Sequence, residues 1–82
     1  MLNVQILSPS GKIFSGQAVA VNVPGTKGQF EILNNHAPIV SSLEEGKVIV
    51  RTGKGEESFK IRSGFVECLN NEVTVLVEGI VE

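Results

Sequence analysis

The fold of this chain is decided by the stretch Val23-Pro24-Gly25-Thr26-Lys27-Gly28-Gln29-Phe30-Glu31-Ile32-Leu33-Asn34-Asn35-His36-Ala37-Pro38. It predicts a strand, a tight turn, a short strand and a second tight turn. In the first turn, Pro24-Gly25 and Gly28 supply the fixed φ and the positive φ that a sharp reversal needs. In the second, Asn34-Asn35 can enter the left-handed region, and Pro38 keeps the residues before it out of a helix. We expect so closely specified a loop to present a binding surface.

An alternation of apolar and polar residues continues on both sides of this stretch, with turn residues spaced at about 8–12 positions. The expected strands are Leu2–Ile6, Lys12–Ser15, Ala18–Val23 with its valines on one face, Gln29–Leu33, Ile39–Leu43, Lys47–Thr52, Glu56–Ile61, Gly64–Leu69 and Val73–Val77. Thr52–Glu56 and Asn70-Asn71 predict hairpin turns, and Ser41–Gly46 has room for a single helical turn. This spacing predicts one all-β domain, a flattened sandwich or barrel.

Composition excludes several classes of function. The 82 residues are 41% hydrophobic and 20% charged with a net charge of −2, which predicts one soluble globular domain. There is no basic stripe for a phosphate backbone, and four Phe without Trp or Tyr offer few stacking platforms, so nucleic acid is a poor partner. No signal peptide is visible, and no apolar run approaches the roughly 20 residues that span a bilayer.

The chain offers few residues of the types that catalysis or metal binding requires. The chain contains no Asp, one His and one Cys, which rules out a Ser-His-Asp triad, an aspartic dyad and an internal disulfide. Cys68 lies in an expected strand, where a small buried hydrophobe is the common role of a free cysteine. The glycines at Gly25–Gly28 and Gly53–Gly55 lack the spacing of a phosphate-binding loop. We therefore expect no catalytic residue, no metal and no cofactor.

The deciding stretch resembles the epsilon subunit of F-type ATP synthases, whose sandwich domain carries a V-P-G-x-x-G-x-F-x-I-L-x-x-H-A-P segment. The resemblance covers nearly the whole chain, through Leu7–Gly11 and Ile13–Gly16 upstream and through Leu43–Gly46 and Ser63–Glu67 downstream. It implies a β-sandwich of about ten mostly antiparallel strands over residues 1–82. Many epsilon subunits continue into a two-helix hairpin after the last strand, and we expect that C-terminal helical domain to be absent here.

The resemblance also implies two contact surfaces. The expected interface with the gamma subunit contains Ser8, His36 and Ser41, and the loop expected to face the membrane rotor ring contains Lys27, Gln29, Phe30 and Glu31. Many relatives have an acidic residue where this chain has Gln29, and Glu31 is the nearest acid on the same face of an extended strand.

The function that this resemblance implies is mechanical. A non-catalytic central-stalk subunit attaches the gamma subunit to the rotor ring (the c-ring), and so couples proton flow to ATP synthesis. It implies a peripheral protein held at the cytoplasmic face of the bacterial inner membrane only through the complex, with a plastid thylakoid as the less favoured location. We expect no transit peptide before the first strand, and on that expectation a bacterial or plastid-encoded origin is favoured.

Two alternatives belong to other classes. Lipoyl and biotinyl carrier domains are β-sandwiches of similar size with a modified lysine on a hairpin tip, and Lys54 between two glycines is the candidate here. The neighbours of Lys54 differ from the motifs of those carriers. A small OB-type nucleic-acid binder is disfavoured by the acidity of the chain and by its few aromatic residues.

Overall fold

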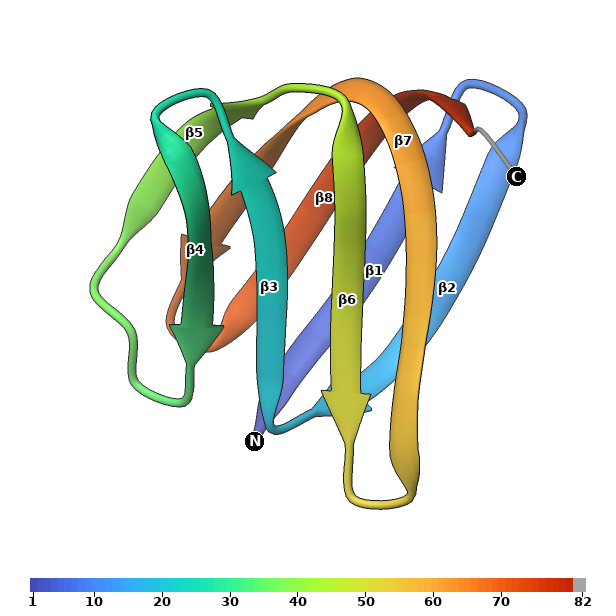
Figure 1. Cartoon of the computed structure of the whole chain (residues 1–82). Helices are drawn as coiled ribbons and strands as arrows, with labels where there is room; N and C mark the ends of the chain where they lie inside the picture. The colour runs from blue at the N-terminus through green and yellow to red at the C-terminus, as the bar shows by residue number, and fades with distance from the viewer. Residues whose placement is uncertain (81–82) are drawn as a thin grey trace.

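The computed structural model describes residues 1–80, and these form eight β-strands and no helix (Figure 1). The all-β prediction is confirmed, with eight strands in place of the ten expected. Residues 81 and 82 of the expected domain lie outside the described part. The strands are β1 (Leu2–Ser8), β2 (Gly11–Ala18), β3 (Ala20–Gly25), β4 (Gly28–Leu33), β5 (Ile39–Leu43), β6 (Gly46–Thr52), β7 (Gly55–Leu69) and β8 (Glu72–Ile80).

The strands form two layers that share β7. Their order is β2-β1-β8-β7-β5-β3-β4, with β6 paired to β3 and β7, and every pairing is antiparallel except β1 with β8. The first half of β7 pairs with β6 and its second half with β5, so this strand passes from one layer to the other (Figure 1). We call β2, β1, β8, β5 and the second half of β7 the first layer. The second layer is β4, β3, β6 and the first half of β7.

The sequence predicted two strands, Glu56–Ile61 and Gly64–Leu69, and this was wrong because one strand of 15 residues covers both. Core-facing residues lie at odd positions as far as Ile61 and at even positions from Gly64 onward, so β7 turns its other face to the core as it changes layers. Gly64 permits the crossing. A Cβ at this position would collide with the carbonyl oxygen of Leu76 on β8.

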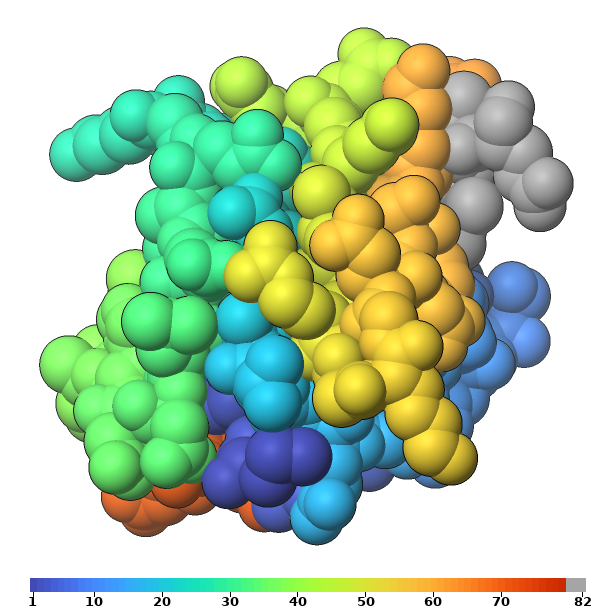
Figure 2. Space-filling view, turned by 60° about the horizontal axis from the view of Figure 1, so that its bottom comes forward, coloured from blue at the N-terminus to red at the C-terminus, as the bar shows by residue number. Residues whose placement is uncertain are grey.

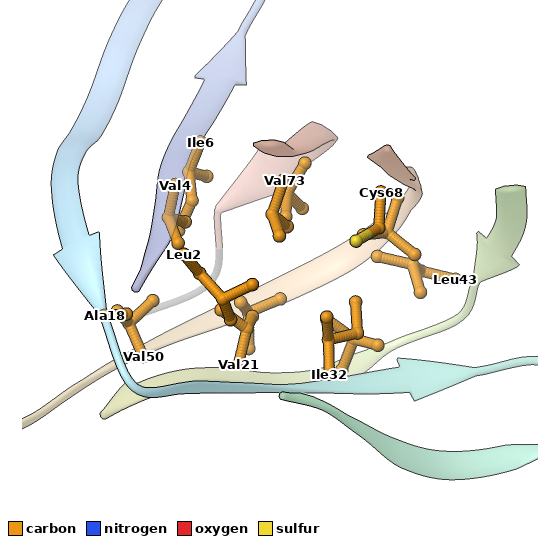
Figure 3. Packing of buried hydrophobic residues seen from close by; sticks show 14 of the residues in the cluster. Leu2, Val4, Ile6, Ala18, Val21, Ile32, Leu43, Val50, Cys68 and Val73 are labelled. Carbon is orange, nitrogen blue, oxygen red and sulfur yellow. The ribbon is translucent and has the colours of Figure 1, made fainter. Parts of the chain in front are cut away.

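The core is an apolar cluster between the two layers (Figure 3). It contains Leu2, Val4 and Ile6 of β1 together with buried residues of each other strand, and no buried residue in the described part is polar or charged. Each fully buried aliphatic side chain stabilises the fold by about 1.5–3 kcal/mol relative to exposure. Cys68 is part of this cluster, and its burial raises the pKa of its thiol, which disfavours the reactive thiolate.

The deciding stretch folds into β3, a turn, β4 and a second turn, as predicted, but the first turn is displaced. Strand β3 runs through Pro24-Gly25, and the turn itself is Thr26-Lys27, with Gly28 at φ 125°. The second turn is confirmed: Asn35 has φ 65°, and the backbone N–H of His36 donates to the carbonyl of Leu33 at 3.0 Å.

Pro24 is tolerated inside the sheet because its backbone faces the edge of β3 away from β4, beyond the end of the ladder with β6. It lies opposite Gln29 of β4, while its carbonyl accepts a hydrogen bond from the backbone N–H of Glu44 at 2.9 Å on the other side. The ladder between β3 and β6 ends at Asn22, so the missing N–H of Pro24 interrupts no pair of that ladder.

Three further predictions can be compared with the structure. Val19 was expected beside Val21 and Val23, but it lies between β2 and β3 and is 41% exposed. Strand β5 occupies Ile39–Leu43, so the helical turn allowed at Ser41–Gly46 does not form. The hairpin turns are confirmed, and at Asn70-Asn71 both residues have positive φ, as a tight two-residue turn requires.

Candidate docking surface

The outer face of the first layer carries large apolar side chains in one row. The strand registers place Leu7 beside Leu76, Leu76 beside Phe65, and Phe65 beside Ser42, across β1, β8, β7 and β5. Leu76 is 50% exposed and Phe65 is 56% exposed. A contiguous exposed apolar row on a small domain is typical of a protein contact site.

A groove of about 540 Å³ runs along this row. Its apolar walls are Leu7, Phe65 and Leu76, and Ser8-Pro9 and Glu78 lie at its margin. Glutamates 67, 72 and 78 are exposed on β7 and β8 of the first layer, as are Phe65 and Leu76. The face can therefore bury apolar side chains of a partner while its acidic groups favour a basic surround.

Ser8, the first residue expected at the gamma interface, lies at the end of β1 and lines this groove. Its hydroxyl donates to the carbonyl of Gly11 at 3.1 Å, and its Oγ lies 3.1 Å from Oγ of Ser10. These contacts fix the turn between β1 and β2. The backbone at the rim of the groove is therefore held in place from within the chain.

His36, the second of these residues, lies at the opposite end of the sandwich. Its loop is tied to Asn71, whose backbone carbonyl accepts from the N–H of Asn3 at the start of β1 at 2.8 Å. Ser8 ends the same strand, five residues or about 17 Å further along. Nδ1 of His36 lies 2.6 Å from the carbonyl oxygen of Ala37.

The loop that carries His36 is held by a pair of asparagines distant in sequence. The backbone N–H of Asn35 donates to Oδ1 of Asn71 at 2.7 Å, and Nδ2 of Asn71 donates to Oδ1 of Asn35 at 3.3 Å. These residues, with His36, Pro38 and Asn70, line a polar hollow of about 320 Å³. We call the hydrogen-bonded pair of Asn35 and Asn71 the asparagine latch, because it fastens the loop after β4 to the hairpin between β7 and β8.

Ser41 lies apart from both Ser8 and His36. It is half-buried on β5 opposite Val66, and its hydroxyl donates to the carbonyl of Ser42 at 3.2 Å. It lines a second hollow, of about 490 Å³, together with Lys27, Gln29 and Phe30. The structure thus groups Ser41 with three of the four residues expected to face the rotor ring.

Glu31, the fourth ring-facing residue, points to another surface. Its carboxylate accepts from the Arg51 guanidinium at 3.2 Å, and Arg51 also approaches Glu56 at 3.8 Å. Both partners of the closer pair are well exposed, so the pair contributes only about 0–1 kcal/mol. Glu31 therefore has an ion-pair partner within the chain, but the pair is weak enough to be exchanged for another.

The apolar row was not among the surfaces predicted from the sequence. The signal for it is present on β7, where Phe65 and Leu69, on either side of Glu67, place large apolar residues on the face opposite Val66 and Cys68. A strand with one face in the core and one in water should alternate apolar with polar residues. The large apolar residues on the outer face of β7 mark that face as a candidate contact surface.

Within the described residues no group of three or more His, Cys, Asp or Glu could hold a metal ion. The same residues contain no helix long and apolar enough to cross a membrane. Lys54 of the carrier alternative stands at the exposed tip of the β6–β7 hairpin. The fold and its exposed apolar row define the class of the molecule as a β-sandwich with a candidate docking surface for another chain.

Comparison with known proteins identifies the family. The sequence profile described as "ATP synthase, Delta/Epsilon chain, beta-sandwich domain" matches residues 1–82, and the chain belongs to this family. The ATP synthase epsilon chain of Caulobacter vibrioides is 38% identical over 99% of this chain and 94% of its own length. That of Synechocystis is 40% identical over 95% of this chain, but only 57% of its own length is covered. The resemblance seen in the sequence is confirmed.

Solved structures share the fold. A chain in the mitochondrial ATP synthase of Euglena gracilis, from a structure of the OSCP, F1 and c-ring, superposes with a TM-score of 0.90 at 18% identity, over 98% of this chain and 52% of its own. A chain in the central stalk and c-ring of the Tetrahymena thermophila enzyme gives a TM-score of 0.80 at 16% identity, over 99% and 66%. Family membership decides against the carrier-domain and nucleic-acid alternatives.

Proposed function

We propose that this epsilon-type chain is a non-catalytic part of the central stalk of a rotary ATP synthase, where it attaches the gamma subunit to the c-ring and couples proton flow to ATP synthesis. The observation that carries the proposal is the exposed apolar row of Leu7, Leu76 and Phe65 over its groove. Family membership names the complex, and the row provides the kind of surface that a permanent partner covers.

The architecture suits the transmission of torque. Two layers that share β7 enclose a core without buried polar residues in the described part, and close-packed interiors have low compressibility. A load applied to one end of such a sandwich reaches the other with little deformation. The role requires shape-complementary surfaces, and it needs no nucleophile, base or cofactor.

We assign the two surfaces to two partners. The gamma subunit covers the first layer from the groove beside Ser8 toward the His36 loop, with Ser41 at its margin, and presents basic groups to the glutamates of this face. The c-ring contacts the β3–β4 hairpin, where Lys27 and Gln29 are exposed at the turn and Phe30 is half-buried behind them. Glu31 supplies the acidic group by exchanging Arg51 for a basic residue of the ring.

We further propose that the β-sandwich over residues 1–82 suffices for attachment without a C-terminal helical hairpin. In this proposal the chain is a peripheral protein, held at the cytoplasmic face of a bacterial inner membrane through its partners. The test of sufficiency is co-elution of these 82 residues with the matching gamma subunit in size-exclusion chromatography at moderate salt. Separate elution of two folded proteins would overturn the proposed function.

A matched pair of variants tests the surface. Leu76→Lys places a charge in the apolar row, while Leu33→Lys places the same charge on the outer face of the second layer, and the two leucines are 50% and 51% exposed. We expect Leu76→Lys to weaken binding to the gamma subunit by at least about tenfold, through loss of apolar contact at the centre of the interface. Leu33→Lys should bind as the unmodified chain does. Equal binding by both variants would remove the row from the interface.

A further inference from the structure

The two sides of the sandwich are closed differently. On one side Phe14 of β2 meets Phe59 of β7 edge to face, with ring centroids 6.0 Å apart. On the other side β4 pairs only with β3, and β3 reaches β5 only at the pair of Gly25 with Leu43. The hollow of about 490 Å³ lies in this opening, between residues 25–30 and residues 39–42. We call it the β4–β5 slot.

The backbone of β5 presents unpaired groups to this slot. The carbonyl of Ser42 accepts from the N–H of Thr26 at 3.2 Å, so it points away from β7. Backbone groups of an antiparallel strand alternate between its two edges, so Val40, two residues earlier, points its N–H and carbonyl the same way. In the described residues no strand pairs with that edge between Ile39 and Ser42.

The edge of β4 is open by the same reasoning. The carbonyl of Pro24 is bonded to Glu44 on the far side of β3, so Pro24 and Gln29 form a non-hydrogen-bonded pair. The N–H and carbonyl of Gln29 therefore point outward from β4. Strand β4 thus has a free edge at Gln29, a residue that lines the slot.

The β5 edge is short, but it carries none of the residues that commonly protect a free edge. Proteins blunt such edges with lysine, proline or bulges, or cover them. Strand β5 contains no charged residue and no proline, and Val40, its second residue, is 72% exposed, the largest value among the large exposed apolar side chains of the described residues. Lys27 is the only charged residue that lines the slot. A covering segment should therefore be extended, apolar and acidic at the end near Lys27.

We propose that an extended segment of a partner subunit adds to β5 as a further strand in the β4–β5 slot. It pairs with the backbone of Val40 over about 13 Å of edge, places an apolar side chain against Phe30 and Ile39, and brings a carboxylate to Lys27. This inference rests on the proposed function, because the partner is another subunit of the synthase. It adds the mode of attachment, which is main-chain pairing rather than side-chain contact alone.

Proline scanning of free edges tests it. Val40→Pro removes an N–H that no strand of the described residues uses, and Ser15→Pro does the same on the free edge of β2, where Ser15 lies opposite Gln5. The complex of this chain with its gamma subunit and c-ring is purified, and the rate at which the chain dissociates is measured. We expect Val40→Pro to dissociate at least about tenfold faster, and Ser15→Pro within about twofold of the unmodified chain.

Two further variants keep the test decisive if a proline disturbs folding. Val40→Lys protects the edge in the manner of natural free strands, and Lys27→Glu reverses the charge of the slot, with Lys54→Glu at the distant hairpin tip as its control. We expect both slot variants to dissociate faster and the control to be unchanged. Circular dichroism melting of each free variant confirms that the fold is retained.

The outcomes separate the two proposals. Failure of the unmodified chain to assemble would overturn the proposed function and this inference together. Assembly of the Val40 and Lys27 variants with unchanged dissociation would overturn the inference alone. A free chain that sediments as a dimer, and becomes monomeric with Val40→Pro, would show that a second copy occupies the slot and would overturn a partner segment.

Discussion

The outer faces of the two layers expose different kinds of side chain to water. On the second layer, Glu31 of β4, Arg51 of β6 and Glu56 of β7 form a chain of exposed ion pairs that crosses over β3. Figure 2 shows this side, with β4 in green at the left and the β6–β7 hairpin in yellow and orange at the right. On the first layer, Phe65 and Leu76 occupy the centre of the outer face instead. The second face exposes mainly charged groups to water, and the first exposes the apolar row that we propose a partner covers.

This difference shows how a small sandwich can present two chemically distinct surfaces. Both faces belong to one continuous sheet and share β7, so the contrast arises from side-chain choice rather than from architecture. The four predictions that follow test the contrast, beginning with the packing beneath the apolar row.

Gly64 supports the apolar row from within. The backbones of β7 and β8 approach so closely at this point that a side chain at position 64 would meet the carbonyl oxygen of Leu76. We expect Gly64→Val to lower the free energy of unfolding by at least about 3 kcal/mol, measured by urea denaturation. Gly53→Ala is the control, because a Cβ there has no atom within 4 Å. A loss of stability no larger than that of the control would show that β7 and β8 can separate at little cost.

Removal of the exposed side chains should change the surface and leave the fold intact. The double variant Phe65→Ser, Leu76→Ser is expected to lose more than about half of the anilinonaphthalene sulfonate fluorescence of the unmodified chain, because the dye binds exposed apolar surface. Leu33→Ser on the second layer should change the fluorescence little. If Leu33→Ser had the larger effect, the assignment of the two faces would be reversed.

The sequence predicted the fold well where local chemistry decides it. The turns at Asn35 and Asn70-Asn71 follow from the tolerance of asparagine for positive φ, and both form as expected. It failed at β7, because the change of inward face between Ile61 and Gly64 depends on the second layer, which no local pattern encodes. It misplaced Val19 for a related reason, since the break between β2 and β3 carries no turn residue.

The candidate site was predictable only in part. The family resemblance named Ser8, His36 and Ser41, but the structure distributes them over three separate hollows. Their proximity depends on how the strands are ordered, and alternation within each strand does not contain that information. The apolar row was detectable in principle, because Phe65 and Leu69 are apolar on the face opposite Val66 and Cys68.

The asparagine latch should stabilise the His36 end of the first layer. Asn71→Gly keeps the positive φ of 63° while it removes the side chain that bonds the backbone N–H and side chain of Asn35. We expect the free energy of unfolding to fall by about 1 kcal/mol and amide exchange of Asn35 to accelerate. Asn70→Gly is the matched control, since Asn70 also has positive φ but takes no part in the latch. Equal effects of the two variants would assign the stability to the backbone turn.

The smallest effect is expected on the charged face, where the ion pair between Arg51 and Glu31 joins side chains that are 53% and 36% exposed. A double-mutant cycle of Arg51→Ala and Glu31→Gln should give a coupling free energy of only about 0–1 kcal/mol, which 1 M salt removes through screening. The pair then makes the second face compatible with water without being needed for the fold, and Glu31 stays free to exchange partners. A coupling well above 1 kcal/mol that persists in high salt would mean that this face is locked and desolvated. In that case Glu31 would not be available to pair with a basic residue of the c-ring. The contrast between a charged, hydrated second face and an apolar first face would then not hold.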